Sequence, residues 1–174
     1  MKIYTKKGDL GETGLCDGKR HGKSSLRIRA LGSVDETNSV IGIAVSQTKS
    51  NDLKKILGTV QENLFAVQGE LAFAKNCSVS ERTVLLLEKE IDKIELRLLP
   101  LKKFIVPGGS VCGSTMHFCR AVCRRTETLL CELNEKEKIN PEILKYFNRL
   151  ADLLFVMARL ENKRNKILEK SPKK

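Results

Sequence analysis

The chain has 174 residues, of which 41% are hydrophobic and 30% charged, and its formal net charge is +11. This length fits a single globular domain, residues 1–174, that buries roughly 70% of the surface of its unfolded chain. The apolar runs are far too short to cross a bilayer and the N-terminus has no apolar signal core, so we expect a soluble, cytoplasmic protein without a membrane partner.

The positive charge is concentrated at the two ends of the chain. Residues 1–29 hold eight Lys and Arg residues against three acidic ones, and residues 162–174 hold six against one. We interpret the C-terminal stretch as a helix end that frays into a disordered, solvated tail at 169–174. The basic N-terminal stretch differs because glycines interrupt it.

Glycines are dense in the N-terminal head, which we define as residues 1–24. They occur at Gly8, Gly11, Gly14, Gly18 and Gly22. This spacing is too tight for a helix and suits a loop whose backbone N–H groups approach phosphate oxygens. The head is therefore predicted to be a nucleotide-binding loop.

Residues 25–168 show the hydrophobic spacing of helices and no convincing strand pattern. Apolar residues recur at steps of three and four, and Ser80 is the expected N-cap of the third helix, as Asn51 or Asp52 is of the second. The helices are expected at about 25–48, 53–71, 80–98, 110–133 and 140–168. We therefore predict an all-α fold, a five-helix bundle with a glycine-rich N-terminal nucleotide-binding loop.

The fourth helix carries a polar stripe that a core helix does not need. At about 100° per residue, His117, Arg120, Arg124 and Glu127 fall within about 80° of one another. The same helix contains Cys112, Cys119, Cys123 and Cys131, which we interpret as reduced core thiols. A metal site built on His117, Cys119 and Cys123 lacks a CxxC pair or a second histidine, so no metal ligand is assigned.

Two other helices carry polar residues within an apolar pattern. In the last helix Asn148, Asp152, Phe155 and Arg159 share a face, which favours a site or a subunit contact over a solvated surface. In the first helix, Asp35 and Glu36 form either a surface patch or an ion pair with an arginine of the fourth helix. Periodicity leaves both alternatives open.

Several separated blocks together resemble the PduO-type ATP:cob(I)alamin adenosyltransferases. They are residues 4–15, 18–23, 32–38, 104–109, 117–127 and 146–155. The resemblance covers nearly the whole chain. It implies a five-helix homotrimer that binds ATP and the corrinoid between subunits, and moves the 5′-deoxyadenosyl group of ATP onto cob(I)alamin with release of triphosphate.

The resemblance also implies roles for individual residues. The phosphates would be held by Thr5, Lys6, Lys7, Gly8, Thr13, Gly14 and Lys23. The nucleotide site would be completed by Arg124, Arg125, Thr126, Glu127, Thr128 and Asn148. Asp35 would pair with Arg120 across the subunit boundary, Phe104 and His117 would contact the corrinoid, and Arg124, Asn148 and Phe104 would be catalytic.

The implied cofactors and partners are ATP, Mg²⁺ on the triphosphate and cobalamin as substrate, with a corrinoid reductase and an adenosylcobalamin-dependent enzyme as further partners. Lysines, arginines and backbone N–H groups would stabilise the charge of a triphosphate leaving group. No general base is needed, because the cobalt centre is the nucleophile. Phe104 would exclude water and the lower axial ligand from cobalt, or else plug the end of the bundle.

Parts of the sequence suggest three other functions. A basic nucleic-acid binder would need aromatic stacking residues, but the chain is only 5% aromatic and has no Trp, so no nucleic-acid partner is expected. A P-loop is disfavoured because Asp17 occupies the first glycine of GxxxxGK[ST]. A non-catalytic corrinoid chaperone on the same fold is compatible with every motif.

Overall fold

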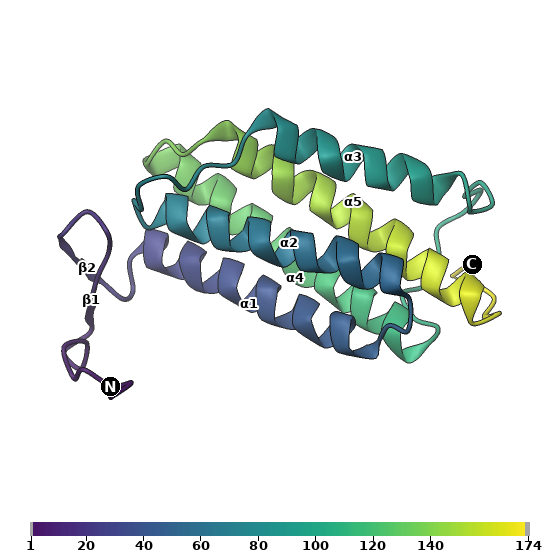
Figure 1. The fold of residues 1–174 in the computed structure, drawn as a ribbon, viewed down its shortest axis with the longest axis horizontal. Helices are drawn as coiled ribbons and strands as arrows, with labels where there is room; N and C mark the ends of the chain where they lie inside the picture. Colours follow the sequence, from purple (N-terminus) through teal and green to yellow (C-terminus); the bar gives the residue numbers. More distant parts are fainter. Residues whose placement is uncertain (1, 173–174) are drawn as a thin grey trace.

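The computed structural model describes residues 2–172, which form an all-α bundle preceded by a small hairpin (Figure 1). The helices are α1 (Leu26–Gln47), α2 (Asn51–Leu71), α3 (Glu81–Glu95), α4 (Val111–Lys136) and α5 (Pro141–Arg164). The strands are β1 (Glu12–Gly14) and β2 (Arg20–Gly22). The predicted five-helix bundle is confirmed.

Polar side chains mark where three of the helices begin. The side chain of Ser110 accepts a hydrogen bond from Gly113 N at 3.0 Å, and that of Asn140 accepts one from Glu142 N at 3.0 Å. Ser50, rather than the predicted Asn51 or Asp52, caps α2 by accepting from Leu53 N at 3.4 Å. Each cap satisfies a backbone donor that the first turn leaves without a helical partner.

Three predicted helix ends differ from the structure. Helix α4 runs past 133 to Lys136, whereas α3 stops at Glu95 and α5 stops at Arg164. Beyond α5, Lys166 adopts a left-handed backbone with φ of 57°, and Ile167 N donates to Asn162 O at 2.9 Å. This hydrogen-bond pattern ends a helix. Residues 167 and 168 are apolar and continue the helical spacing, so the spacing alone predicted a longer helix.

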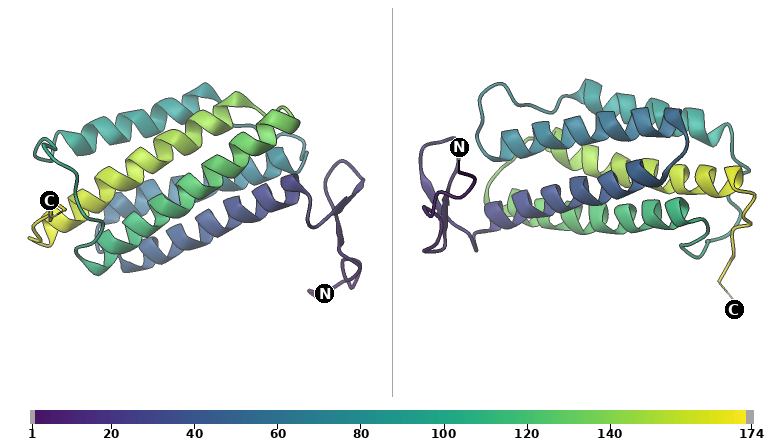
Figure 2. Two further views of the ribbon diagram at one scale, coloured as in Figure 1. Left: turned by 180° about the vertical axis from the view of Figure 1, so that it is seen from behind. Right: turned by 60° about the horizontal axis from the view of Figure 1, so that its bottom comes forward.

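Helices α4 and α5 form the centre of the bundle. Helix α4 packs against α1 and α5, α5 also packs against α3, and α1 packs against α2. Both views of Figure 2 show this layering of roughly parallel and antiparallel helices. Tyr146 and Phe147 on α5 are the largest side chains that are fully buried in the core.

The head contains strand structure that the sequence did not predict. Strands β1 and β2 pair antiparallel, with Glu12 opposite Gly22 and Gly14 opposite Arg20. Each has three residues, which is too short to show the alternation by which strands are identified. The predicted loop is therefore a hairpin with flanking turns.

The chain ends with ordered contacts where a disordered tail was expected. The carboxylate of Glu169 accepts from Arg159 Nε at 3.0 Å, and Lys170 O accepts from Val106 N at 2.7 Å. Residues 169 and 170 therefore lie against the bundle. Residues 173 and 174 of the predicted tail lie outside the described residues.

All six cysteines are free thiols. Cys112, Cys119 and Cys123 are buried as predicted, but Cys131 is exposed, because it lies on the outer face of α4. Burial raises the pKa of Cys112 to about 11 and that of Cys119 to about 12, so these thiols are protonated. Nowhere in residues 2–172 do three His, Cys, Asp or Glu side chains gather as metal ligands.

No helix in the described part of the chain is long and apolar enough to span a membrane.

Candidate functional site

The head brings Gly8 and Lys23 together. A Cβ atom at Gly8 would lie 3.1 Å from Lys23 Nζ and 3.2 Å from Glu12 O, so the ammonium group occupies the space beside the glycine. Lys23 N also donates to Gly11 O at 2.8 Å. Two residues predicted to hold phosphate, Gly8 and Lys23, thus lie side by side in the head.

Arg20 organises the same segment and was missed by the sequence analysis. Its Nη2 donates to Lys7 O at 2.6 Å and to Glu12 O at 3.2 Å. These bonds tie β2 to the turn before β1, where Lys6 has a left-handed φ of 60°. Thr5, Lys6 and Lys7 are exposed beside this turn, and Thr13 and Gly14 lie in β1. A single arginine among many basic residues offered no signal for this role.

The head projects beyond one end of the bundle (Figures 1 and 2). Among the described residues no hydrogen bond or ion pair joins it to α4. The two predicted halves of the nucleotide site are therefore separate within one copy of the chain.

On α4, two of the predicted residues make polar contacts with the neighbouring helices α1 and α5, and a third is exposed. Arg124 is exposed, and the neighbouring Arg125 pairs with Glu36 at 2.7 Å. Asn148 donates to Glu127 Oε1 at 3.0 Å. The pair of Arg125 with Glu36 confirms that a carboxylate of the first helix meets an arginine of the fourth.

The structure places the two threonines of this set differently. Thr128 is exposed and donates to Arg124 O at 3.1 Å. Thr126 is fully buried, 2.7 Å from Ser33 Oγ and 2.9 Å from Thr37 Oγ1. Its hydroxyl is thus used in the contact between α1 and α4, so the prediction that Thr126 contacts ATP is wrong for this conformation.

Arg120 and Asp35 do not meet within one copy of the chain. Asp35 accepts a hydrogen bond from Gln68 Nε2 at 3.0 Å. Arg120 Nε is buried and has no hydrogen-bond partner among the described residues. A buried guanidinium donor without an acceptor is costly, so Arg120 has unsatisfied bonding capacity.

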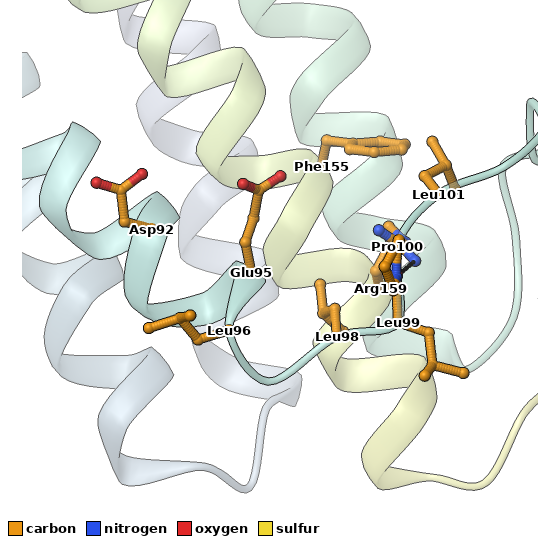
Figure 3. Close-up of a pocket in the computed structure, with 9 residues that line it drawn as sticks. All are labelled: Asp92, Glu95, Leu96, Leu98, Leu99, Pro100, Leu101, Phe155 and Arg159. Atoms are coloured by element: carbon orange, nitrogen blue, oxygen red, sulfur yellow. Dashed lines mark hydrogen bonds between the residues drawn. The ribbon is translucent and has the colours of Figure 1, made fainter.

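A cleft of about 610 Å³ lies where α3 ends beside α5 (Figure 3). Its walls are Asp92, Glu95, Leu96, Leu98, Leu99, Pro100, Leu101, Phe155 and Arg159. Two members of the polar face predicted on the last helix, Phe155 and Arg159, thus line a hollow. Arg159 is only 8% exposed, and its Nη2 donates to Leu99 O at 2.9 Å, which fixes the segment after α3.

His117 lies behind this cleft. Its ring packs edge-on against Phe155 with 6.0 Å between centroids, and the residue is 3% exposed. Burial, assisted by the charge of Arg120, lowers the pKa of His117, so the ring is neutral at pH 7. Because His117 is buried within one copy of the chain, its predicted contact with the corrinoid is not open in this conformation, and its ring packs against Phe155 instead.

Phe104 lies on the loop between α3 and α4 and is 87% exposed. It therefore does not plug the bundle end. The end of this loop is held by Asn162, whose Oδ1 accepts from Ser110 N at 2.9 Å and whose Nδ2 donates to Gly108 O at 2.8 Å. Gly109, with φ of 120°, has no room for a side chain beside Asn162. Asn162 was not predicted, because its partners Ser110 and Gly108 lie 52 and 54 positions earlier in the chain and only the fold brings them together.

These features suit an anion and an apolar ligand better than hydrolytic or nucleophilic catalysis. Exposed cationic groups are present on both the head and α4, and most of the side chains that line the cleft beside α5 are apolar. A family profile described as cobalamin adenosyltransferase matches residues 3–161. The chain belongs to this adenosyltransferase family.

Relatives of this adenosyltransferase match over nearly their whole lengths. The corrinoid adenosyltransferase of Bacillus subtilis is 42% identical, over 96% of this chain and 90% of its own. The cobalamin adenosyltransferase of Cupriavidus metallidurans is 43% identical, over 93% and 89% respectively.

Solved structures show the same fold. A variant PduO-type ATP:corrinoid adenosyltransferase from Lactobacillus reuteri, complexed with cobalamin and ATP, has a TM-score of 0.94 and 32% identity. The match covers 99% of this adenosyltransferase and 100% of the solved chain. A second variant of that protein, complexed with ATP, has a TM-score of 0.92.

Proposed function

We propose that this adenosyltransferase transfers the 5′-deoxyadenosyl group of ATP to cob(I)alamin, forming adenosylcobalamin and releasing triphosphate. The observation that carries the proposal is the match over 99% of the chain to a protein complexed with both cobalamin and ATP. The separate cationic surfaces on the head and on α4, and the apolar cleft beside α5, provide matching chemistry for the two substrates.

The head and α4 bind the nucleotide. Backbone N–H groups around Gly8 and the ammonium of Lys23 hold phosphate oxygens, while Arg124 approaches from α4. These cationic groups stabilise the charge that grows on the triphosphate as the C5′–O bond breaks. Their second effect is to orient the ribose carbon toward the corrinoid. Thr5, Lys6, Lys7, Thr13 and Gly14 belong to the same surface of the head.

Hydrogen bonds among Glu127, Asn148 and Arg149 fix the side chains near Arg124 on the α4 surface. Glu127 and Asn148 bond each other at 3.0 Å, and Asn148 Oδ1 accepts from Arg149 at 2.6 Å. These bonds fix the orientation of the Asn148 amide, and its remaining hydrogen-bonding groups bind the nucleotide. Arg125 and Thr128 lie on the same face. No side chain acts as a general base, because the reduced corrinoid substrate is itself the nucleophile.

Mg²⁺ would accompany the triphosphate. Mg²⁺ keeps several waters and is commonly held through phosphate oxygens plus few protein ligands. We therefore propose that the metal arrives with the nucleotide and assign it no protein ligand. When bound, it would neutralise charge on the leaving triphosphate.

We propose a homotrimer in which neighbouring copies complete each site. One copy keeps its head away from its own α4 surface (Figure 1), so a neighbour's head is needed to bring both cationic groups to one nucleotide. The unpartnered Nε of Arg120 supports a subunit contact, and Asp35 on α1 is the proposed acceptor from the next copy.

The corrinoid is proposed to lie against the apolar surface formed by the cleft and the loop after α3. Leu98, Leu101 and Phe155 line the cleft, and Phe104 follows three residues after Leu101 with its ring in solvent. In this position Phe104 excludes water and a lower axial ligand from the cobalt, which favours reduction. His117 supports Phe155 from behind.

Cytoplasmic location is proposed on the state of the cysteines. All six are free, including the exposed Cys16 and Cys131, which suits a reducing compartment. The reaction also requires a reductant for cobalt, so we propose a corrinoid reductase as supplier and an adenosylcobalamin-dependent enzyme as consumer of the product.

The deciding experiment is anaerobic incubation of the protein with ATP and cob(I)alamin. We expect the corrinoid spectrum to change to that of the adenosylated product, with one triphosphate released per product formed. Corrinoid binding without triphosphate release would instead favour the chaperone alternative, and the absence of any corrinoid binding would contradict both.

A further inference from the structure

Phe73 occupies a backbone position that normally takes glycine. It follows the end of α2 with φ of 62°, in the left-handed region that bulky residues rarely adopt. Phe73 N donates to Glu70 O at 3.1 Å, and Ala74 N donates to Gly69 O at 2.8 Å. This pair of bonds is the Schellman pattern, whose left-handed residue is usually glycine. The backbone of a phenylalanine in this conformation is strained, so contacts of its ring must hold the residue in place.

The ring of Phe73 lies between the head and α1. It stacks on His21 of β2 with 6.3 Å between centroids and an angle of 29°. The Arg27 guanidinium of α1 lies 4.3 Å from the centroid of the same ring. Arg27 is in turn held by Glu137 at 2.8 Å and by Leu71 O at 2.9 Å. The aromatic ring thus connects the hairpin, through buried Arg27, to α1, to the end of α2 and to Glu137, which directly follows α4.

The contacts at Phe73 are also where the head meets the bundle. Cys16 N donates to Ala72 O at 2.9 Å, next to the stack of His21 on Phe73. Within residues 2–172, these are the hydrogen bonds and ring contacts that join the head to residues beyond α1. Residues 72–73 therefore provide the hydrogen bond and the ring contact that hold the hairpin against the end of α2.

We propose that Phe73 is a positioning residue that docks the hairpin on the end of α2 and so sets the orientation of the phosphate-binding head. The inference rests on the proposed function of the head. It assigns to Phe73 no contact with ATP; the effect passes through His21 and β2 to Thr13, which pairs with His21, and to Gly8 and Lys23.

Phe73→Gly separates positioning from folding. Glycine adopts the left-handed backbone without strain, so the thermal midpoint should stay the same or rise. The head loses its stack, so the KM for ATP should rise about three- to tenfold, while the KM for the corrinoid and kcat at saturating ATP stay unchanged. A purely structural role for Phe73 would leave the KM for ATP unaltered.

Two further variants serve as controls. Phe73→Tyr keeps the ring and should restore the parental KM for ATP. Phe65→Ala removes an aromatic ring that is 66% exposed on α2 and should leave the KM for ATP unchanged. A parental KM in Phe73→Gly, or a KM in Phe73→Tyr as high as that of Phe73→Gly, would overturn the proposal.

Hydrogen exchange without nucleotide tests the docking even if the protein shows no adenosyltransferase activity. Exchange over residues 12–22, which include the Cys16 amide, should accelerate about three- to tenfold in Phe73→Gly. Unaltered exchange there would refute the docking role. Lack of turnover in the parent protein would refute the proposed function alone.

Discussion

Lys23 Nζ lies 3.1 Å from the position that a Cβ atom of Gly8 would occupy. The absence of a side chain at Gly8 therefore gives the ammonium group its place beside exposed backbone N–H groups. Such a combination of cationic and backbone donors suits a phosphate group.

Gly8→Val should displace Lys23 and weaken nucleotide binding. We expect the KM for ATP to rise about tenfold, because a charge-assisted hydrogen bond is lost or lengthened. Gly22→Val is the matched control, since no atom lies within 4 Å of a Cβ at Gly22. Steady-state kinetics with varied ATP measures both variants. An equal effect of the two substitutions would argue against a specific role for the space at Gly8.

Arg124→Ala should lower turnover without unfolding the bundle. Arg124 is exposed, so the fold loses little, whereas the transition state loses about 1.5 to 3 kcal/mol of charge-assisted hydrogen bonding. This corresponds to about a ten- to hundredfold loss in rate. Arg82→Ala, at another exposed arginine on α3, should keep parental kcat/KM. Unchanged turnover of the Arg124 variant would remove that residue from the mechanism.

Phe104→Ala should separate cobalt reduction from ATP binding. Because the ring is 87% exposed, its loss should change the free energy of unfolding by less than about 0.5 kcal/mol. The KM for ATP should stay parental while activity starting from cob(II)alamin and a reductant falls. Phe65→Ala, at another exposed phenylalanine that lies on α2 away from the cleft, provides the surface control. If the variant were as active as the parent protein when the assay starts from cob(II)alamin, Phe104 would have no role in reduction.

Arg120→Asp should shift the assembly to lower mass by removing its proposed pair with Asp35 of the next subunit. Sedimentation velocity should show the shift, and the double variant Arg120→Asp with Asp35→Arg should recover trimer. A charge change at Lys89, an exposed residue of α3, serves as the control. Trimer in every variant would show that this pair does not hold the assembly.

Thr126→Ala should affect stability and leave ATP kinetics unchanged. The substitution removes the hydroxyl that Ser33 and Thr37 contact, so we expect the free energy of unfolding to fall by about 1 to 3 kcal/mol. Thr126→Ser keeps the hydroxyl, so its free energy of unfolding should fall by less. Chemical denaturation gives the free energies. An increased KM for ATP in an otherwise stable Thr126→Ala protein would return this residue to the nucleotide site.

The sequence predicted helices well where periodicity and caps agree. Ser80 and Ser110 stand at the starts of α3 and α4 as expected, because a periodic apolar run acts over a few residues. The side chain of Ser110 caps its helix, whereas that of Ser80 makes no capping hydrogen bond. Predictions failed where the deciding partner is distant. Thr126 looked like a member of the arginine surface, yet two hydroxyls of α1 bury it.

The glycine density of the head, the polar stripe on α4 and the order of the five helices follow from the sequence alone, since each depends on neighbouring residues. Only the tertiary structure decided that Asn162 holds the loop before α4, that Arg159 lines a cleft, and that Phe73 meets His21. Those contacts join residues far apart in the chain, and their positions depend on how the helices pack.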